Sequence, residues 1–415
     1  MFLILSYRIV STLLGARKYA WIVDKVAQKT APEKSAQLGC LVSGEGKKDI
    51  YDGEIMKKRP LLNTKNVIGF VLIALLNARF LFQVILGVPL PLLEIVIYGI
   101  LIFSVNYQKQ TYAFVWLPVM TVLCLAFNHE AIRLLFIMLV CFAFYGIEIK
   151  KIALYNCICA FILFLIIQIL LYVGILENEH VVYTTDIGLV RERNDMGIGL
   201  NRIGLFVSAF IMNLYILIAH LRKFWVVALL FSIAFVIFYY TNSQTSFVGE
   251  MALILAFLIY ESRWRKILFN KTVFIYLPLL FTVLSLGLGI AVDRFPILNL
   301  LTSNRLYFTN IYLHSAGISD LLVGNATFNS ITIDNIYIRL LFEGGILFYL
   351  FFYYIYYKAI HNLFEKDGYL LPVIIGFLVT GLGETNFLGI AIIGNAVIWN
   401  VLYNNAFRKK EILLR

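Results

Sequence analysis

The stretch Asp293–Glu343, DRFPILNLLTSNRLYFTNIYLHSAGISDLLVGNATFNSITIDNIYIRLLFE, is the longest polar interval between two hydrophobic spans of this chain. Its cations are Arg294, Arg305 and Arg339, and it contains no lysine. Lipid tails offer no hydrogen-bond partner to free backbone N–H and C=O groups, so a polar interval of this length does not lie among them. Residues 293–334 are therefore predicted to form a large loop outside the bilayer, between two helical spans.

The composition of the chain is typical of a membrane protein. Of its 415 residues, 61% are hydrophobic and only 14% are charged, and the mean hydropathy is +0.85. A soluble domain carries about 25% charged residues. Apolar runs of roughly 17–25 residues recur along the chain, and each is long enough to cross a bilayer as a helix. The predicted fold class is an all-α, polytopic membrane helix bundle.

The apolar runs predict about twelve membrane spans. Their approximate limits are 67–87, 90–107, 112–128, 131–148, 152–176, 199–219, 224–240, 246–260, 272–292, 335–357, 369–386 and 387–404. Residues 1–55 do not match this pattern, because their apolar segment is too short to span and the remainder is polar. We expect an N-terminal extension that is disordered or not native, with translation from Met56 as an alternative. Residues 56–415 are expected to form the transmembrane domain, with a second external loop at 177–198.

The distribution of lysine indicates which loops face the cytoplasm. The formal net charge of +11 would indicate a nucleic-acid partner in a soluble protein. Here, however, the positive-inside rule accounts for it, because lysine and arginine concentrate in cytoplasmic loops. With the spans given above, every lysine after Met56 falls on one side of the membrane. Both termini are therefore expected in the cytoplasm, and no nucleic-acid partner is expected.

The outer side uses arginine without lysine. The arginines on or near it are Arg191, Arg193, Arg202, Arg294, Arg305 and Arg339. A guanidinium group is planar and binds phosphate through two hydrogen bonds, which a lysine ammonium does not. This selective use of arginine indicates a site for an anion at the outer leaflet. The alternative is that single arginines anchor the chain at the interface or pair with nearby carboxylates, as Arg339 would with Glu343.

Three polar motifs accompany these arginines. Arg193 and Gly204 are separated by ten residues, the turn at 241–246 reads TNSQTS, and residues 334–346 read DNIYIRLLFEGGI. The first spacing is common by chance, and a tight connection between two spans needs polar residues in any case. The motifs therefore carry more information together than singly.

Polar side chains in and near these motifs are candidates for binding sugar or accepting a proton. Asp334 and His314 are candidate bases for a sugar hydroxyl. Asp is also a good N-cap at the start of a helix, which is the structural alternative for Asp334. The candidate ligands for sugar hydroxyls are Thr241, Ser243, Asn325 and Asn335. No cluster of metal ligands is seen, and the five cysteines show no spacing typical of zinc or a disulfide framework.

Taken together, the motifs resemble those of the Wzy-type polymerases of O-antigen and capsular polysaccharide and, more distantly, the O-antigen ligases. The resemblance covers residues 56–415 by topology, and its motifs lie at 191–204, 241–247 and 305–346. It implies a GT-C-like membrane glycosyltransferase, without metal or other cofactor, in the bacterial plasma membrane. Such an enzyme joins undecaprenyl-diphosphate-linked repeat units at the outer face, alongside a flippase and a chain-length regulator. The residues that would bind the diphosphate are Arg193, Arg202, Arg305 and Arg339.

Two departures from the family pattern bear on the choice of function. The ligases carry a His-Asn pair where this chain has Asp334-Asn335, which favours the polymerase, with Asp334 as its base. The polar turn has Gln244 where relatives often carry arginine. An O-antigen ligase stays open as an alternative. So does a flippase for lipid-linked sugars, although transporters usually place ionisable residues near the middle of the membrane.

Overall fold

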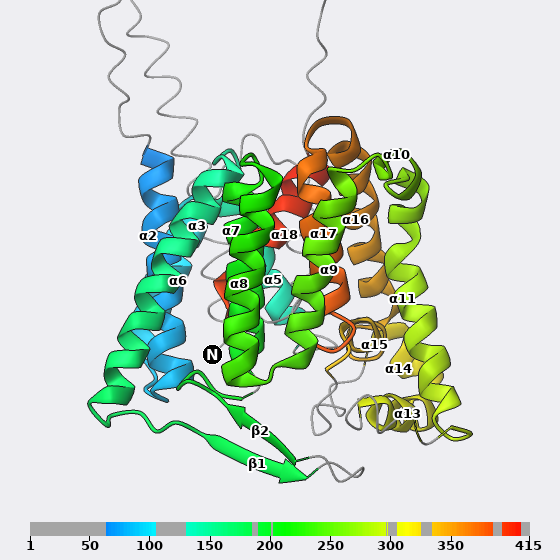
Figure 1. Cartoon of the computed structure of the whole chain (residues 1–415), viewed down its shortest axis with the longest axis horizontal. Coiled ribbons are helices and arrows are strands. Elements are labelled where there is room, and N and C mark those ends of the chain that lie inside the picture. Colours follow the sequence, from blue (N-terminus) through cyan, green and yellow to red (C-terminus); the bar gives the residue numbers. More distant parts are fainter. Residues whose placement is uncertain are drawn as a thin grey trace, which may run out of the picture. The chain divides into compact units, whose positions relative to one another are not determined.

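The computed structural model describes residues 64–104, 130–184, 190–200, 202–295, 297, 305–324, 334–384 and 392–407. All of them belong to one compact unit, Pro60–Arg415. The expected extension 1–55, the expected span 112–128 and Asn325 lie outside the described residues. Most of the described part is helical (Figure 1), as the sequence predicts.

The elements follow one another as helices with a single short hairpin between the fourth and fifth of the described α-helices. They are α2 (Thr64–Arg79), the π-helix η1 (Phe80–Ile85), α3 (Pro91–Ser104), α5 (Glu130–Ala143), α6 (Ile149–Tyr172), β1 (His180–Thr184), β2 (Val190–Asn194), α7 (Ile203–Ile218), α8 (Lys223–Thr241), α9 (Gln244–Tyr260), α10 (Arg265–Leu268), α11 (Lys271–Ala291), α13 (Arg305–Ser315), α14 (Ile318–Val323), α15 (Ile336–Phe342), α16 (Gly345–Lys366), the 3₁₀ turn η4 (Gly368–Leu370), α17 (Leu371–Thr380) and α18 (Ile393–Phe407).

Four helical segments among the described residues are long and apolar enough to cross a membrane. They are Thr64–Ile85, Ile149–Tyr172, Lys223–Thr241 and Lys271–Ala291, with 22, 24, 19 and 21 residues. At about 1.5 Å per residue these lengths match the hydrocarbon thickness of about 30 Å. The expected class of helical membrane protein is consistent with these segments.

The expected number of about twelve spans is not reached in the described part of the chain. The runs at 199–219 and 369–386 form α7, with 16 residues, and α17, with ten. Most residues of both helices are buried against other helices. An apolar run can therefore form part of the interior of a helix bundle without crossing a bilayer. The run at 335–357 is divided into α15 and α16, because Gly345 adopts φ +78 and ends the regular helix there.

The external loop expected at 177–198 contains an antiparallel hairpin, which the sequence analysis did not predict. Strands β1 and β2 pair from His180 opposite Asn194 to Thr184 opposite Val190. The hairpin lies across one end of the helices (Figure 1), and its strand β2 contacts the end of α8 through a hydrogen bond from Asn242 Nδ2 to the Glu192 carbonyl, 3.3 Å. The same end carries α13 and α14 from the large polar interval.

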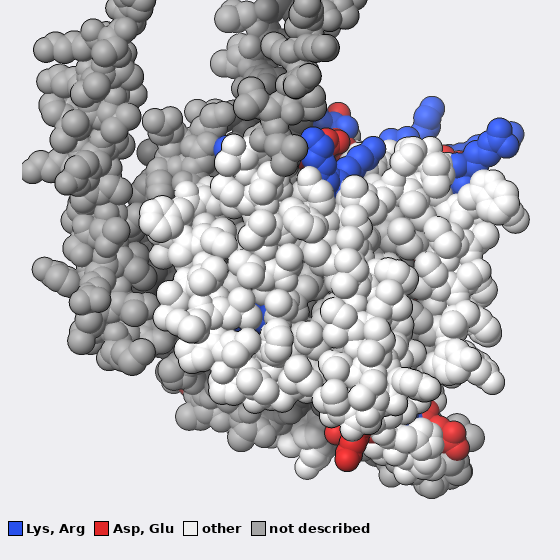
Figure 2. All heavy atoms as spheres, turned by 90° about the vertical axis from the view of Figure 1, so that its left-hand side faces the viewer, with Lys and Arg blue, Asp and Glu red and all other residues white. Residues whose placement is uncertain are grey.

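The visible charged side chains gather at the two ends of the helices (Figure 2). Most of the visible lysines and arginines in Figure 2 gather at the upper edge, the end at which α10 lies in Figure 1. Acidic side chains are visible at both edges, some among the basic side chains of the upper edge and others at the lower edge (Figure 2). The surface between the edges is almost free of charge, as expected for a belt that contacts lipid.

Helices α9 and α17 approach each other closely because glycines face the contact. A β-carbon on Gly249 would overlap the Thr380 hydroxyl, and one on Gly376 would lie 2.8 Å from the β-carbon of Leu253. Small residues at such contacts allow backbones in a membrane bundle to come together and gain van der Waals energy. Because Thr380 precedes the turn that carries part of the candidate site, this contact also holds that turn in place.

We expect Gly249→Ala to lower the free energy of unfolding by about 1–3 kcal/mol, because the added methyl group overpacks the contact between α9 and α17. The matched control is Gly287→Ala, since a β-carbon at this helical glycine meets nothing within 4 Å. Alanine is the better helix former, so the control is expected to unfold at an equal or higher temperature. Thermal unfolding of the purified chain measures both, and equal losses in the two variants would contradict the prediction.

Candidate functional site

Arg305, the first residue of α13, connects three other parts of the chain. Its Nε lies 3.4 Å from Asp334 Oδ2, and its Nη2 lies 3.6 Å from Glu384 Oε1. Its Nη1 donates to Thr245 Oγ1 at 2.5 Å and to the carbonyl of Gly383. We call these five residues the Arg305 cluster. The large polar interval, the start of α9 and the turn after α17 thus meet at one guanidinium group.

The two carboxyl groups of the Arg305 cluster have raised pKa values. Burial raises the pKa of Glu384 to about 7; the cation of Arg305 opposes this shift, and the carboxylate of Asp334 adds to it. Burial also raises the pKa of Asp334, against the opposing charges of three arginines. These are, in decreasing order, Arg305, Arg339 and Arg193. Near neutral pH, Glu384 can therefore gain or lose a proton, which suits a group that takes part in proton transfer.

Glu384 is a site residue that the sequence analysis missed. It was counted inside the apolar span 369–386, but α17 ends at Thr380 and Glu384 lies in the turn that follows. A single acidic residue inside an apolar run was the signal that would have identified it, because ionisable residues in such runs are costly and usually functional. Its pairing with Arg305 was not predictable, since the two residues are far apart in the sequence.

Arg193 on β2 lies near the same carboxyl groups. Its positive charge opposes the rise in pKa that burial causes in both Asp334 and Glu384. Its Nη2 donates to the carbonyl of Leu200 at 3.0 Å, whereas its buried Nε has no hydrogen-bond partner within the described part of the chain. A buried guanidinium N–H that lacks a partner is costly. An anion placed at this edge of the cluster would satisfy it.

The other two predicted diphosphate ligands are held elsewhere. Arg339 pairs with Glu343 four residues on, with 2.7 Å between Nε and Oε2, and both side chains are largely buried. This is the structural alternative given above, although the charge of Arg339 still reaches Asp334. Arg202 donates from Nη1 to the carbonyl of Val84 in η1, 3.1 Å. The four arginines therefore do not form one open group: three surround Asp334, and Arg202 is bound to another helix.

Asn335, and not Asp334, is the N-cap of α15. Asn335 Oδ1 accepts from the backbone N–H groups of Tyr337 and Ile338, at 3.0 and 3.2 Å. Its Nδ2 donates to Ser285 Oγ at 2.8 Å and to the carbonyl of Leu382 at 3.0 Å. These four bonds occupy the amide that was expected to bind sugar. They also free Asp334 from a capping role, so its carboxylate is directed to the arginines.

His314 lies at the other end of α13. It is nine residues from Arg305, or about 13 Å along the helix axis. Its Nε2 is 3.3 Å from Asp293 Oδ2, and both side chains are more than half exposed. Hydrogen bonds from Asn310 and His314 lower the pKa of Asp293. The structure therefore places the second candidate base with Asp293 and away from Asp334.

The two residues of the polar turn that were predicted to bind sugar are buried. Thr241 is fully buried, and its Oγ1 donates to the carbonyl of Ile237 at 2.8 Å. Ser243 is 7% exposed and packs against Gly204 of α7. The neighbouring Thr245 is the turn residue that contacts Arg305. The predicted sugar ligands of this turn therefore face the interior, and Thr245, which was not predicted, faces the cluster.

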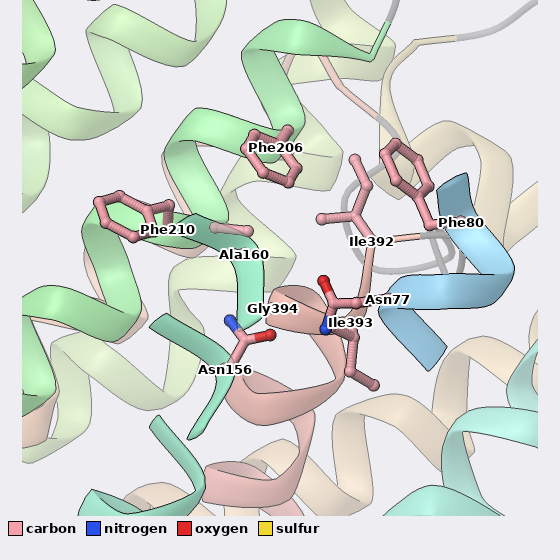
Figure 3. A pocket seen from close by; sticks show the side chains of 10 residues that line it. Asn77, Phe80, Asn156, Ala160, Phe206, Phe210, Ile392, Ile393 and Gly394 are labelled. Atoms are coloured by element: carbon pink, nitrogen blue, oxygen red, sulfur yellow. The ribbon is translucent and has the colours of Figure 1, made fainter. Parts of the chain in front are cut away.

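Two small cavities lie apart from the Arg305 cluster. The first, in Figure 3, lies between α2, α6, α7 and the start of α18, and Asn77 and Asn156 are its polar side chains. The second lies between α7, α8 and α9 and is described below. Each is about 10 Å³ in volume, which is room for about one water molecule. Among the described residues, no group of three or more His, Cys, Asp or Glu side chains is placed to hold a metal ion.

Comparisons with protein-family models, with curated proteins and with solved structures found no match for this chain.

Proposed function

We propose that this chain is a membrane glycosyltransferase that polymerises undecaprenyl-diphosphate-linked oligosaccharide repeat units at the outer face of the bacterial plasma membrane. The observation that carries the proposal is the Arg305 cluster, in which Arg305 lies between Asp334 and Glu384 while Arg193 acts on both carboxyl groups. Such a transferase needs a base for the incoming hydroxyl and cations for the departing diphosphate. The cluster contains both kinds of group.

In the proposed reaction, the acceptor hydroxyl loses its proton to Asp334 and attacks the anomeric carbon of the donor sugar. The bond between that carbon and the diphosphate oxygen breaks, and undecaprenyl diphosphate leaves with the bonding electron pair. Arg193, through its unpartnered Nε, and Arg305 would stabilise the charge on the diphosphate. Glu384, with a pKa of about 7, would take up the proton from Asp334 and release it to water.

The concentration of lysines and arginines at one end of the helices (Figure 2) supports an outward-facing site. The edge at which lysines and arginines gather lies opposite the edge of the hairpin and α13. Under the positive-inside rule, the first edge is cytoplasmic and the second is external. With this orientation an even number of spans would place both termini in the cytoplasm. A flippase and a chain-length regulator are the partners that this function would require.

One observation favours a second candidate, a flippase for lipid-linked oligosaccharides. Glu250 lies within α9 and is 2% exposed, although α9 is one of the apolar helices of the bundle. Ionisable residues at such depth are typical of transporters and their coupling-ion pathways. The glycosyltransferase is preferred because the acidic and basic residues are more concentrated in the Arg305 cluster at the external edge.

Deletion of the gene separates the candidate functions through the glycan that the cells make. For a polymerase, we expect single repeat units on the surface and no long chains. Loss of all surface glycan would identify a flippase, and long chains that remain unattached would identify a ligase. The control is complementation with the wild-type gene, which must restore the original chain-length distribution. Either of the last two phenotypes would overturn the proposal.

A further inference from the structure

The cavity between α7, α8 and α9 contains buried oxygen atoms that the Arg305 cluster does not use. Its polar lining comes from Thr241, Ser243, Ser246 and Glu250, and Gly204 of α7 forms part of its wall. Figure 1 shows the three helices side by side, and their residues are in contact. Ser246 and Glu250 are four residues apart in α9, so their side chains project from the same face of that helix.

Two of these polar groups have no partner. Ser246 and Glu250 are each 2% exposed, and Ser246 Oγ and Glu250 Oε1 are buried without a hydrogen bond within the described part of the chain. None of the described lysines, arginines or histidines forms an ion pair with Glu250. An unpaired carboxylate in an apolar interior is very costly, so Glu250 must either take up a proton or have its charge balanced by a cation inside the cavity.

The wall at Gly204 gives the cavity its shape. A β-carbon at this position would overlap the hydroxyl oxygens of both Ser243 and Ser246, so these two oxygens lie against the bare α-carbon and close to each other. The lone pairs of Thr241 Oγ1 stay available, because that hydroxyl donates its hydrogen to the Ile237 carbonyl. The side chains that line the cavity therefore offer oxygen acceptors and a carboxylate, and no nitrogen donor.

We propose that this cavity binds one small monovalent cation of the Na⁺ class through Glu250 and the hydroxyls of Ser243, Ser246 and Thr241. Oxygen-only ligands suit hard cations. A single carboxylate balances one positive charge, whereas Ca²⁺ requires six to eight oxygen ligands and Mg²⁺ retains its waters. The volume of about 10 Å³ accepts a guest of about the size of one water molecule.

The ion would stabilise the turn that supports the Arg305 cluster. Thr245, which accepts a hydrogen bond from Arg305, immediately precedes Ser246 in the first turn of α9. The chain reverses between α8 and α9 at Asn242, which adopts the left-handed conformation with φ 50. A cation bound to residues on both sides of that reversal would hold it in one conformation.

The test is the dependence of thermal unfolding on Na⁺, measured on the full chain in detergent with NaCl replaced by choline chloride at constant ionic strength. We expect a saturable rise in the unfolding temperature with Na⁺, because a ligand that binds only the folded state stabilises it by mass action. Equilibrium binding of ²²Na⁺ is expected to give one ion per chain. No rise and no binding would overturn the proposal.

Two variants assign the response to this cavity. Glu250→Gln and Ser246→Ala are each expected to weaken Na⁺ binding at least about tenfold, equivalent to about 1.4 kcal/mol. The readout is the response to Na⁺ and not the absolute unfolding temperature, so it stays valid if Glu250→Gln is more stable without Na⁺. If Glu250→Gln does not fold, Ser246→Ala decides the question alone.

The matched controls remove the same groups elsewhere. Ser208→Ala removes a serine of equal burial on α7 that hydrogen-bonds to Thr380 outside the cavity, and Glu261→Gln removes an exposed carboxylate at the end of α9. Both are expected to keep the wild-type response to Na⁺. A wild-type unfolding temperature that depends on pH but not on Na⁺, with the pH dependence lost in Glu250→Gln, would show that a proton occupies the site and would overturn the proposal.

Discussion

Replacing Arg305 by alanine is expected to abolish polymer formation while single repeat units still reach the cell surface. The guanidinium group contacts both carboxyl groups and two further acceptors in the Arg305 cluster. In the variant, the departing diphosphate would lack a cation that stabilises its charge. Removal of one such preorganised donor typically slows a reaction by about 10²–10³-fold. Arg305→Lys is expected to lose most activity as well, because a single ammonium group does not reproduce the planar fork.

The matched control for this experiment is Arg294→Ala. Arg294 is an exposed arginine just after α11, and its side chain forms no hydrogen bond or ion pair with the other described residues. Surface arginines of this kind contribute little, so polymer length and amount are expected to stay normal. Normal polymer in Arg305→Ala would remove Arg305 from the mechanism.

Loss of folding is separable from loss of chemistry in Arg305→Ala. Without the cation, Asp334 and Glu384 lose the charge that both of them pair with, and we expect the free energy of unfolding to fall by about 2 kcal/mol. This is less than for a fully buried pair, because all three side chains are partly exposed. Arg305→Ala combined with Glu384→Gln removes one of the two charges and is expected to recover part of the stability but no activity. Recovery of activity together with stability would assign Arg305 a structural role only.

Replacing Asp334 by asparagine is expected to reduce polymerisation by about 10²–10⁴-fold, the usual contribution of a general base. Asparagine has nearly the same shape but does not accept the proton of the sugar hydroxyl. The cap of α15 is supplied by Asn335, so the helix start stays intact and the change in the free energy of unfolding is expected to be below about 1 kcal/mol. In vitro polymerisation with purified chain and lipid-linked substrate measures the rate. Undiminished activity would rule out Asp334 as the base.

Asn335→Ala is the neighbouring control, and the opposite pattern is expected from it. Loss of the cap and of the bonds to Ser285 and Leu382 is expected to lower the free energy of unfolding by about 1–2 kcal/mol. Activity per folded molecule is expected to stay close to that of the wild type, because all polar atoms of this amide are used inside the protein. A stable but inactive Asn335→Ala would instead make Asn335 a ligand of the substrate.

The helical class followed from local properties of the chain. Hydropathy and charge are properties of each residue and its neighbours, so the runs that became α6, α8 and α11 were recognisable before folding. The same local reasoning predicted more spans than are found among the described residues, because an apolar run such as α7 has the same hydropathy whether lipid or other helices cover it. It also missed the hairpin β1–β2, whose pairing depends on two segments that are separate in the sequence.

The identity of the site was decided by tertiary contacts. The sequence by itself pointed to Arg305 and Asp334, because a polar interval rich in arginine stood out against apolar surroundings. Glu384 belongs to the site only because the turn after α17 packs beside α13. Arg202 does not belong to it, because its side chain is hydrogen-bonded to η1. The choice of Asn335 over Asp334 as the cap was made by the backbone at the start of α15. The type of each side chain determines whether it is more stable in water or in lipid. Ion pairs, in contrast, act over a few ångströms, and only folding brings residues that are distant in the sequence within that range.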